Sequence, residues 1–344
     1  MKTQVLKPNE AALDMAAELL KGGSLVGIPT ETVYGLGADA LNPEAVKRIF
    51  DAKGRPGDNP LIVHIADIAA LRPLISAEPS KNARKLMDAF WPGPLTLIFP
   101  RSEIVPLCTT GGLNTVAVRM PSHPVARELI RRSGLCIAAP SGNRSGRPSP
   151  TTADHMFEDM DGRIDLIIDG GESDVGVEST VVDMTGELPR ILRPGGVTPE
   201  QIEAVCGGCI VDSTVLRPLR EDERPISPGT KYRHYAPDGN LTIFRGDAEQ
   251  VAAQICAEYD RAAAEGKRPL ILALEENISR YGARKLESLG RNAEEMAHAI
   301  FADLRDADHL HADVILSEGI DPEGIGLAVM NRLGRAAAFH IVEL

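Results

Sequence analysis

The chain has 344 residues, of which 43% are hydrophobic and 25% charged, and a formal net charge of -12. This length is enough for two domains with cores of their own, and an acidic chain is poorly suited to binding nucleic acid mainly through its phosphates. No apolar run is long enough to span a bilayer, and the first residues, MKTQVLKPNE, lack the apolar core of a signal peptide, so we expect no membrane contact and a cytoplasmic location.

Helices and strands are predicted to interleave from the first residues onward. Asn9 is a helix cap and Gly22 a helix end, and the apolar residues between them recur at helical spacing. Asn42 and Ser80 begin two further helices in the same way. A helix is also predicted at 124–132, and strands at 24–29, 61–65, from about Thr96, 114–120, 136–141, 165–171 and 179–184. This α/β pattern, with a hairpin at 179–193, predicts an open, mixed, twisted sheet with helices.

The regular pattern stops near residue 206 and resumes near residue 239. The segment between is rich in proline and charge, so we interpret it as a linker, and a connection this long is more often functional than idle. Beyond it, strands are predicted at 241–246, 268–274 and 312–319, and helices at 247–266, 291–310 and 326–337. This rhythm is Rossmann-like, but no G-x-G-x-x-G follows its first strand, so no dinucleotide is predicted. The predicted organisation is a catalytic domain at 1–205, a linker or lid at 206–238 and a smaller α/β domain at 239–344.

Two of the five cysteines, Cys206 and Cys209, form a C-x-x-C pair. Such a pair can bind metal or exchange electrons, but a zinc site needs a second pair of ligands, and none is near in the sequence. We interpret the pair as a glycine-rich turn that carries two thiols, and we predict no metal site built from the chain's own residues.

The most informative run is PTETVYGLG, at 29–37. Thr30 and Thr32 follow a predicted strand and lie in a loop that Gly35 and Gly37 are expected to close. Ligands of open α/β sheets bind beyond the carboxyl ends of the strands. Hydroxyl groups and free backbone N–H groups at such a place suit a small zwitterion or a phosphate.

A second polar loop, KGRPGDNP, leads into the next apolar strand. Lys53 and Arg55 lie two residues apart, so in extended backbone they point to the same side, where they can hold an anion. By itself such a pair is more typical of a solvated surface. His64 in the following strand is either a hydrogen-bonded core residue or a partner for a carboxylate or bicarbonate.

Two later segments add polar groups. In NTVAVRM, Thr115 and Arg119 share one strand face, and an arginine that points inward needs an anionic partner. In SGNRSGRPSP, the hydroxyls of Ser141 and Ser149 and the amide of Asn143 lie in a loop that either cradles phosphate or is a flexible surface loop.

Together and in this order, the motifs resemble those of the YrdC-like threonylcarbamoyl-adenylate synthases. They are PTETVYGLG, K-x-R with DNPLIVHI, NTVAVRMP, APSGNRSG, GVEST, ILRPG and SPGTKYRHYAP. The last motif and the carboxyl-terminal domain indicate the long, two-domain form, and the resemblance covers essentially the whole length. The chain departs from the family pattern at Gly142, where alanine is usual, and at Thr230, where methionine is common.

The resemblance implies a nucleotidyltransferase that condenses L-threonine, bicarbonate or CO2 and ATP to threonylcarbamoyl-AMP and pyrophosphate. The product feeds the modification of the adenosine next to the anticodon of certain tRNAs, through a downstream threonylcarbamoyl transferase complex, and contact with tRNA itself is expected to be secondary. The residues implied for threonine are Thr32, His64, Arg119, Ala139 and Ser179. Those implied for ATP, with Mg2+ bridging its phosphates, are Arg55, Asn59, Thr115, Ser141, Asn143, Ser149, Arg193, Tyr232 and Tyr235.

The implied reaction needs no covalent enzyme intermediate. The threonine amine attacks bicarbonate or CO2, and an oxygen of the resulting carbamate attacks the α-phosphate. Lys53 and Arg55 are the expected catalytic residues, as cations that offset charge on the phosphates, and His64 is the candidate base for the amine. The linker is expected to act as a lid, with Tyr232 and Tyr235 closing over the unstable intermediate.

Two alternatives stay open. The first domain is an RNA-binding, translation-associated module in one reading, although the acidic charge and an aromatic content of 4% count against it. In the other reading the chain is a different carbamoyl-adenylate enzyme, although the hydroxyl-bearing residues implied for threonine favour an amino-acid substrate.

Overall fold

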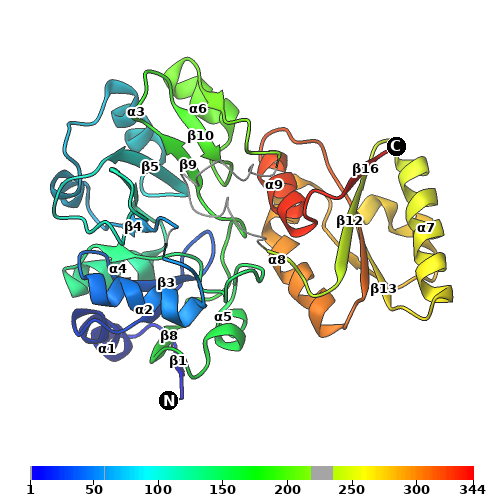
Figure 1. The fold of residues 1–344 in the computed structure, drawn as a ribbon, viewed down its shortest axis with the longest axis horizontal. Helices are drawn as coiled ribbons and strands as arrows, with labels where there is room; N and C mark the ends of the chain where they lie inside the picture. The colour runs from blue at the N-terminus through cyan, green and yellow to red at the C-terminus, as the bar shows by residue number, and fades with distance from the viewer. Residues whose placement is uncertain (1, 58, 218–234) are drawn as a thin grey trace. The chain divides into compact units, whose positions relative to one another are not determined.

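The structure is a computed structural model that describes residues 2–57, 59–217 and 235–344 (Figure 1). The linker positions Thr230 and Tyr232 therefore lie outside the described residues. The chain folds as two units, which we describe separately. The first comprises Met1–Ser145 and Ser149–Val215, and the second comprises Gly146–Pro148 and the chain from residue 235 to its end.

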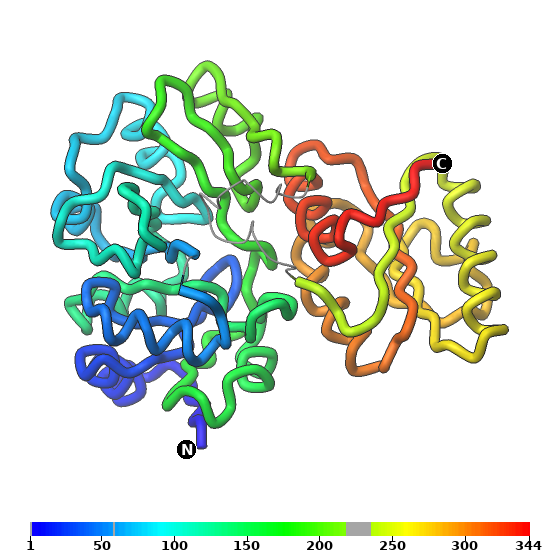
Figure 2. The backbone as a smooth tube through the Cα atoms, in the orientation of Figure 1, coloured from blue at the N-terminus to red at the C-terminus, as the bar shows by residue number. Residues whose placement is uncertain are grey.

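One large sheet forms the centre of the first unit. Within the described residues its 11 strands follow the order β1 (Gln4–Leu6), β8 (Leu166–Ile168), β2 (Val26–Ile28), β3 (Gly35–Asp39), β7 (Ile137–Ala138), β4 (Ile62–His64), β6 (Thr115–Arg119), β5 (Leu95–Pro100), β9 (Thr180–Asp183), β10 (Arg190–Arg193) and β11 (Ile210–Val211). Parallel and antiparallel neighbours alternate irregularly, and β9 and β10 form the predicted hairpin. The prediction of a mixed sheet is confirmed, and Figure 2 shows its amino-terminal strand beside the segment that carries β8.

Helices cover both faces of this sheet. One face is packed by α1 (Glu10–Lys21) and α4 (Pro124–Ser133), and the other by α2 (Pro43–Lys53), α3 (Lys81–Phe90), α5 (Ala153–Met160), α6 (Pro199–Cys206) and the short helix η1 (Ile68–Leu74). Successive residues of a strand point to opposite faces of the sheet and so contribute to the hydrophobic core on each side. In β8, Leu166 and Ile168 pack with the first group of helices and Ile167 packs with the second. Asn9 and Asn42 cap α1 and α2 as predicted, as Ser80 caps α3.

The segment from Gly35 to Asp39 forms the strand β3, and the expectation that Gly35 and Gly37 close a loop is wrong. Two glycines hide the alternation of buried residues in this strand. A side chain at Gly37 has no room, because an added Cβ atom would lie 2.3 Å from Cδ1 of Ile28 on the neighbouring strand β2. Gly37 is therefore required by the close approach of two strands. A glycine is also typical of a turn, and for this reason the sequence predicted a loop here.

The second unit is a smaller, parallel α/β fold, as predicted. Its sheet has the order β14 (Leu286–Ser288), β13 (Pro269–Ala273), β15 (Val314–Glu318), β12 (Asn240–Arg245) and β16 (Ile341–Glu343), and its helices are α7 (Ala248–Ala264), α8 (Ala293–His309), α9 (Gly326–Ala336) and the short η2 (Glu275–Tyr281). All paired strands are parallel. Figure 1 shows α7 on one face of this sheet and α8 and α9 on the other.

Short elements account for most of what the sequence did not predict. The strands β1, β11, β14 and β16 have two or three residues each, which is too short for an alternating pattern to stand out. The helices α5 and α6 have eight residues each and were not predicted either. In the part of the chain that the structure describes, no helix is both long enough and apolar enough to cross a membrane.

Candidate functional site

The polar loop after β2 is short and buried. Thr30 and Thr32 are 4% and 0% exposed. The hydroxyl of Thr30 donates to the carbonyl oxygen of Val33 at 2.6 Å, so in the 2.9 Å contact between the two threonines the hydroxyl of Thr32 is the donor. These bonds fix the Thr32 side chain at the carboxyl end of β2.

Arg119, the last residue of β6, lies at the centre of the cluster. Its guanidinium donates to the Thr32 hydroxyl at 2.8 Å and to the Gly93 carbonyl at 3.2 Å, and its Nη2 atom lies 2.6 Å from Oε1 of Glu31. The Arg119 and Glu31 side chains are 4% and 5% exposed. Glu31 is thus the anionic partner that an inward arginine requires. Glu31 was not among the predicted site residues, and its signal in the sequence was an acidic residue three positions after a buried strand.

His64 lies beside Arg119, because β4 pairs with β6 in the register that aligns these two residues. The ring is buried, and its Nδ1 atom lies 3.1 Å from the Ile62 carbonyl oxygen, so Nδ1 carries the proton and Nε2 is an acceptor. Burial, followed by the positive charge of Arg119, lowers the pKa of His64 to about 3. His64 is therefore neutral at pH 7 and a weak base, which argues against the expectation that it accepts the amine proton.

Ser179 connects the two predicted groups of ligand residues. Its hydroxyl lies 2.7 Å from that of Thr96, which pairs with Arg119 on the neighbouring strand. Arg193 on β10 donates from Nε and Nη2 to the Ser179 carbonyl oxygen at 3.1 and 2.9 Å. A residue expected to contact threonine and one expected to contact ATP are thus in direct contact, and Thr96 is a neighbour that the sequence analysis missed.

Three further predicted residues lie on or next to the strands of this sheet, and not all of them are near Arg119. Ala139 follows β7 and its N–H donates to the Ile62 carbonyl at 3.1 Å. Asn59 is fully buried, and among the described residues its side-chain amide has no hydrogen-bond partner. Thr115 begins β6, so about 13 Å of extended chain separates it from Arg119 at the other end, and the structure does not bring the two together.

Lys53 is the last residue of α2, and not part of an extended loop as the sequence suggested. Gly54, in the left-handed conformation with φ 62°, ends the helix. The Lys53 side chain is 3% exposed, and its ammonium group donates to the carbonyl oxygens of Ser141 and Asn143, the latter at 2.6 Å. Burial, followed by the charge of Arg55, lowers the pKa of Lys53 well below its usual value. The lysine therefore holds the loop that begins at Ser141.

The same loop carries three residues predicted for ATP. The hydroxyl of Ser141 donates to Oδ1 of Asn143 at 2.6 Å. The hydroxyl of Ser149 donates to Oε1 of Glu178 at 2.6 Å, and both side chains are buried. Glu178 was not predicted as a site residue, although it lies in the quoted GVEST motif. The loop is therefore held by a hydrogen bond of its own and by bonds to the buried side chains of Lys53 and Glu178.

Tyr235 belongs to the second unit. Its ring is buried, with its centroid 5.0 Å from that of Phe301, and the Arg332 guanidinium lies 5.7 Å from the ring. The thiols of Cys206 and Cys209 lie near backbone carbonyls, and burial raises the pKa of both. Among the described residues, no group of three or more histidine, cysteine or acidic side chains is arranged to hold a metal ion.

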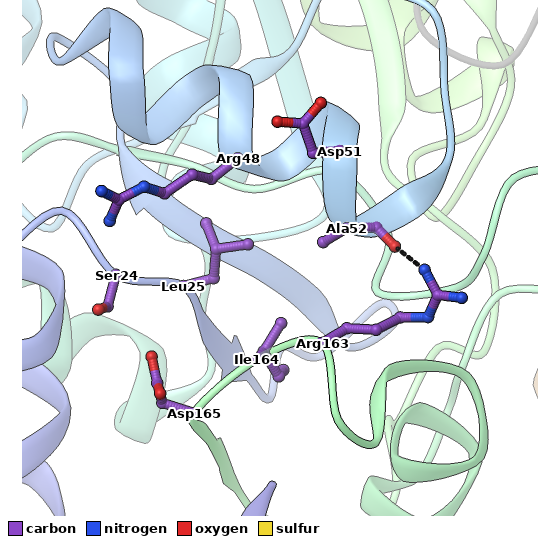
Figure 3. A pocket seen from close by; sticks show the side chains of 8 residues that line it. All are labelled: Ser24, Leu25, Arg48, Asp51, Ala52, Arg163, Ile164 and Asp165. Atoms are coloured by element: carbon purple, nitrogen blue, oxygen red, sulfur yellow. Dashed lines mark hydrogen bonds between the residues drawn. The ribbon is translucent and has the colours of Figure 1, made fainter. Parts of the chain in front are cut away.

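A pocket of about 400 Å³ lies at the amino ends of β2 and β8, whereas the cluster around Arg119 lies at the carboxyl ends of its strands (Figure 3). Ser24 and Asp165, which line it, precede β2 and β8, whereas Thr30 and Thr32 follow β2. Figure 3 shows Arg163 bonded to the carbonyl of Ala52, at 3.2 Å. No residue that the sequence analysis assigned to a site lines this pocket.

The arrangement suits binding and polarisation of substrates, and not nucleophilic catalysis by a side chain. The hydroxyls of Thr32 and Ser179 have arginine and threonine as partners, and among the described residues neither is hydrogen-bonded to a histidine, lysine or carboxylate that could remove its proton. A buried arginine with hydroxyl groups around it suits a small carboxylate. A glycine- and serine-containing loop held by a buried lysine, with arginines close by, suits a phosphate chain.

Comparisons with known proteins agree with this description. The family described as "Telomere recombination" matches residues 18–195, and the family described as "Threonylcarbamoyl-AMP synthase, C-terminal domain" matches residues 197–338. The threonylcarbamoyl-AMP synthase of Bacillus subtilis (strain 168) is 48% identical over 344 residues, which cover 99% of this chain and 97% of that protein. That of Pyrococcus abyssi is 47% identical over 335 residues, covering 97% and 96%.

A solved structure extends the likeness to three dimensions. The crystal structure of P. abyssi Sua5 complexed with L-threonine matches with a TM-score of 0.94 and 46% identity, over 99% of this chain and 100% of that one. The whole chain, including both units, is therefore shared with these relatives. The chain belongs to the threonylcarbamoyl-AMP synthase family, in its long, two-domain form.

Proposed function

We propose that this protein condenses L-threonine, bicarbonate or CO2 and ATP to threonylcarbamoyl-AMP and pyrophosphate. The observation that carries the proposal is the buried cluster at the carboxyl ends of β2, β4 and β6, where Arg119 contacts Thr32 and Glu31. Full-length relatives at 48% and 47% identity bear the name of this enzyme, and the related P. abyssi structure is described as a complex with L-threonine.

The proposed threonine site consists of Thr32, His64, Arg119, Ala139 and Ser179. Arg119 supplies the positive charge for the substrate carboxylate, because its side chain is buried and its guanidinium carries five donors. Neutral His64 offers Nε2 as an acceptor. The Ser179 and Thr96 hydroxyls provide partners for a substrate hydroxyl.

The proposed ATP site follows from the neighbouring loop. Its residues are Arg55, Asn59, Thr115, Ser141, Asn143, Ser149, Arg193, Tyr232 and Tyr235, the first of which is also a proposed catalytic cation together with Lys53. Because Lys53 donates to the carbonyls of Ser141 and Asn143, we propose that it acts both as a nearby charge and as the support of the loop. The closure of the linker over the site stays a proposal.

We propose that Mg2+ enters with ATP. The described residues contain no cluster of acidic or histidine ligands for a metal, so the phosphate oxygens are the natural ligands, as is usual for this ion. The ion would neutralise charge on the phosphates, while the arginines of the chain orient them. The product would pass to a downstream threonylcarbamoyl transferase complex that acts on tRNA in the cytoplasm, where ATP and tRNA meet.

Pyrophosphate release tests the proposal directly. We expect release only when ATP, L-threonine and bicarbonate are all present, and mass spectrometry should then detect threonylcarbamoyl-AMP. Omitting each substrate in turn is the control. Release that does not depend on threonine would contradict the proposal and favour a different carbamoyl-adenylate reaction.

A further inference from the structure

The contact between Glu31 and Arg119 leaves part of the bonding capacity of the carboxylate unused. Glu31 is 4% exposed, and neither of its oxygens makes a hydrogen bond of standard geometry among the described residues. Its charged partner is the Arg119 guanidinium at 2.6 Å, and the backbone N–H groups of Ser122 and of Glu31 itself lie near enough to favour its charged form. A carboxylate accepts about four hydrogen bonds. A buried carboxylate without a hydrogen bond of standard geometry is costly unless a further donor reaches it.

The charge state of Glu31 is that of an anion. Burial by itself raises the pKa of a carboxyl group, but the positive charge of Arg119 and nearby backbone N–H groups outweigh this, and the pKa of Glu31 is lowered. The His64 ring, which lies beside Arg119 on the neighbouring strand, is neutral at pH 7. Glu31 is thus the negative charge that faces the cluster of Thr32 and Arg119.

A buried pair of one anion and one cation is complementary to a zwitterion. Arg119 has donors left for a substrate carboxylate, because its partners among the described residues are the Thr32 hydroxyl, the Gly93 carbonyl and a single Glu31 oxygen. The ammonium group of an amino acid offers three donors, and Glu31 can accept from one or more of them. A bound zwitterion adds no net charge to the site, so burying it is less costly than burying an anion alone.

We propose that Glu31 binds the ammonium group of the amino-acid substrate while Arg119 binds its carboxylate. This inference rests on the proposed function, and it adds a specificity residue that was absent from the predicted site. It implies that the enzyme selects for the α-amino group at the binding step. A merely structural ion pair between Glu31 and Arg119 would hold the strands together equally well without distinguishing amines.

The test compares L-threonine with (R)-3-hydroxybutyrate, which keeps the carboxylate and the hydroxyl but lacks the amine. Calorimetric titration of both ligands into the wild-type protein and into Glu31→Gln gives the preference for the amine. We expect the substitution to lower the preference for threonine roughly 10- to 100-fold, because one charge-assisted interaction is lost. The affinity for 3-hydroxybutyrate should stay the same or rise.

A matched control is Glu318→Gln in the second unit. Glu318 is also buried, at 2% exposed, but the Asn277 amide and the Leu274 N–H donate to it. This variant should bind both ligands as the wild type does. If Glu31→Gln keeps the wild-type preference, the inference is wrong while the function stands. If the wild type itself binds no threonine, the proposed function fails.

A second measurement needs no variant. The ammonium group of 15N-labelled L-threonine bound to the wild-type protein should titrate at a higher pH than in free threonine, because a carboxylate contact favours the charged form. Nuclear magnetic resonance of the bound ligand reads this pKa directly. An amine pKa that is unchanged or lowered on binding would overturn the assignment of Glu31, even if Glu31→Gln did not fold.

Discussion

The ammonium group of Lys53 lies 2.6 Å from the carbonyl oxygen of Asn143, a residue 90 positions further along the chain. The last side chain of α2 thus fixes the start of the loop that runs to Ser149. The backbone bond from the Ser145 N–H to the Lys53 carbonyl, at 3.0 Å, fastens the same loop a second time. A buried cation that satisfies backbone carbonyls makes the shape of the loop depend on a helix end.

Lys53→Met should therefore affect both stability and rate. The substitution leaves the Ser141 and Asn143 carbonyls without their donor, at a cost of about 1–3 kcal/mol in the free energy of unfolding. We expect threonine-dependent pyrophosphate release to fall at least tenfold, as well as weaker hydrogen-exchange protection at Ser145. The control is Lys47→Met, on an exposed position of the same helix, which should leave both unchanged. A Lys53→Met enzyme of wild-type rate would refute this role.

Glu178 should influence ATP through Ser149. Its carboxylate accepts the Ser149 hydroxyl at 2.6 Å, and this bond fixes the direction of the side chain. We expect Glu178→Ala to raise the KM for ATP several-fold with a smaller effect on the KM for threonine. Glu178→Gln keeps an acceptor oxygen and should lie closer to the wild type. Equal changes in both KM values would point instead to a general disturbance of the site.

His64 should make stability depend on pH. Its pKa is about 3 in the folded protein against 6.5 in the unfolded chain, so the unfolded state binds a proton first as the pH falls. The contribution of neutral His64 is present above pH 6.5 and is lost as the pH falls toward 3, by at most about 1.4 kcal/mol per pH unit.

Thermal unfolding of wild type and His64→Asn at pH 7 and pH 4.5 measures this effect. The difference in unfolding temperature between them should shrink, or change sign, at the lower pH. His311→Asn, at an exposed position, serves as the control. A difference that is the same at both pH values would show that the His64 ring does not titrate as described.

The close approach of β2 and β3 predicts an interaction between two substitutions. Gly37→Ala places a Cβ atom 2.3 Å from Cδ1 of Ile28, and such overpacking costs about 1–3 kcal/mol. Ile28→Val removes that methyl group at a cost of its own. The double variant should be more stable than the sum of the two changes predicts, as chemical denaturation of all four proteins would measure. Additive changes would mean that the strands move apart instead.

Regular elements could be predicted from the sequence where local chemistry defines them. Asn9 and Asn42 predict the starts of their helices, because helix capping depends only on residues that are close together in the sequence. Glu31 could not be predicted as the partner of Arg119. The two residues follow or end strands β2 and β6, which are far apart in the sequence and are brought near one another only by the order of the strands in the sheet. Lys53 was expected to face solvent or substrate, and the carbonyls that it contacts carry no signal in the sequence.

The two-residue strand β11 is the edge strand of the large sheet and covers β10, which carries Arg193. A chain cut at residue 205 would lose Ile210 and Val211, and with them the backbone partners of Arg190 and Ile191. It would also lose Asp212, which forms an ion pair with Arg190. Such a fragment would present an open strand to other copies of itself, and edges of this kind invite aggregation. A catalytic unit that extends beyond Asp212 would keep both β11 and the ion pair with Arg190.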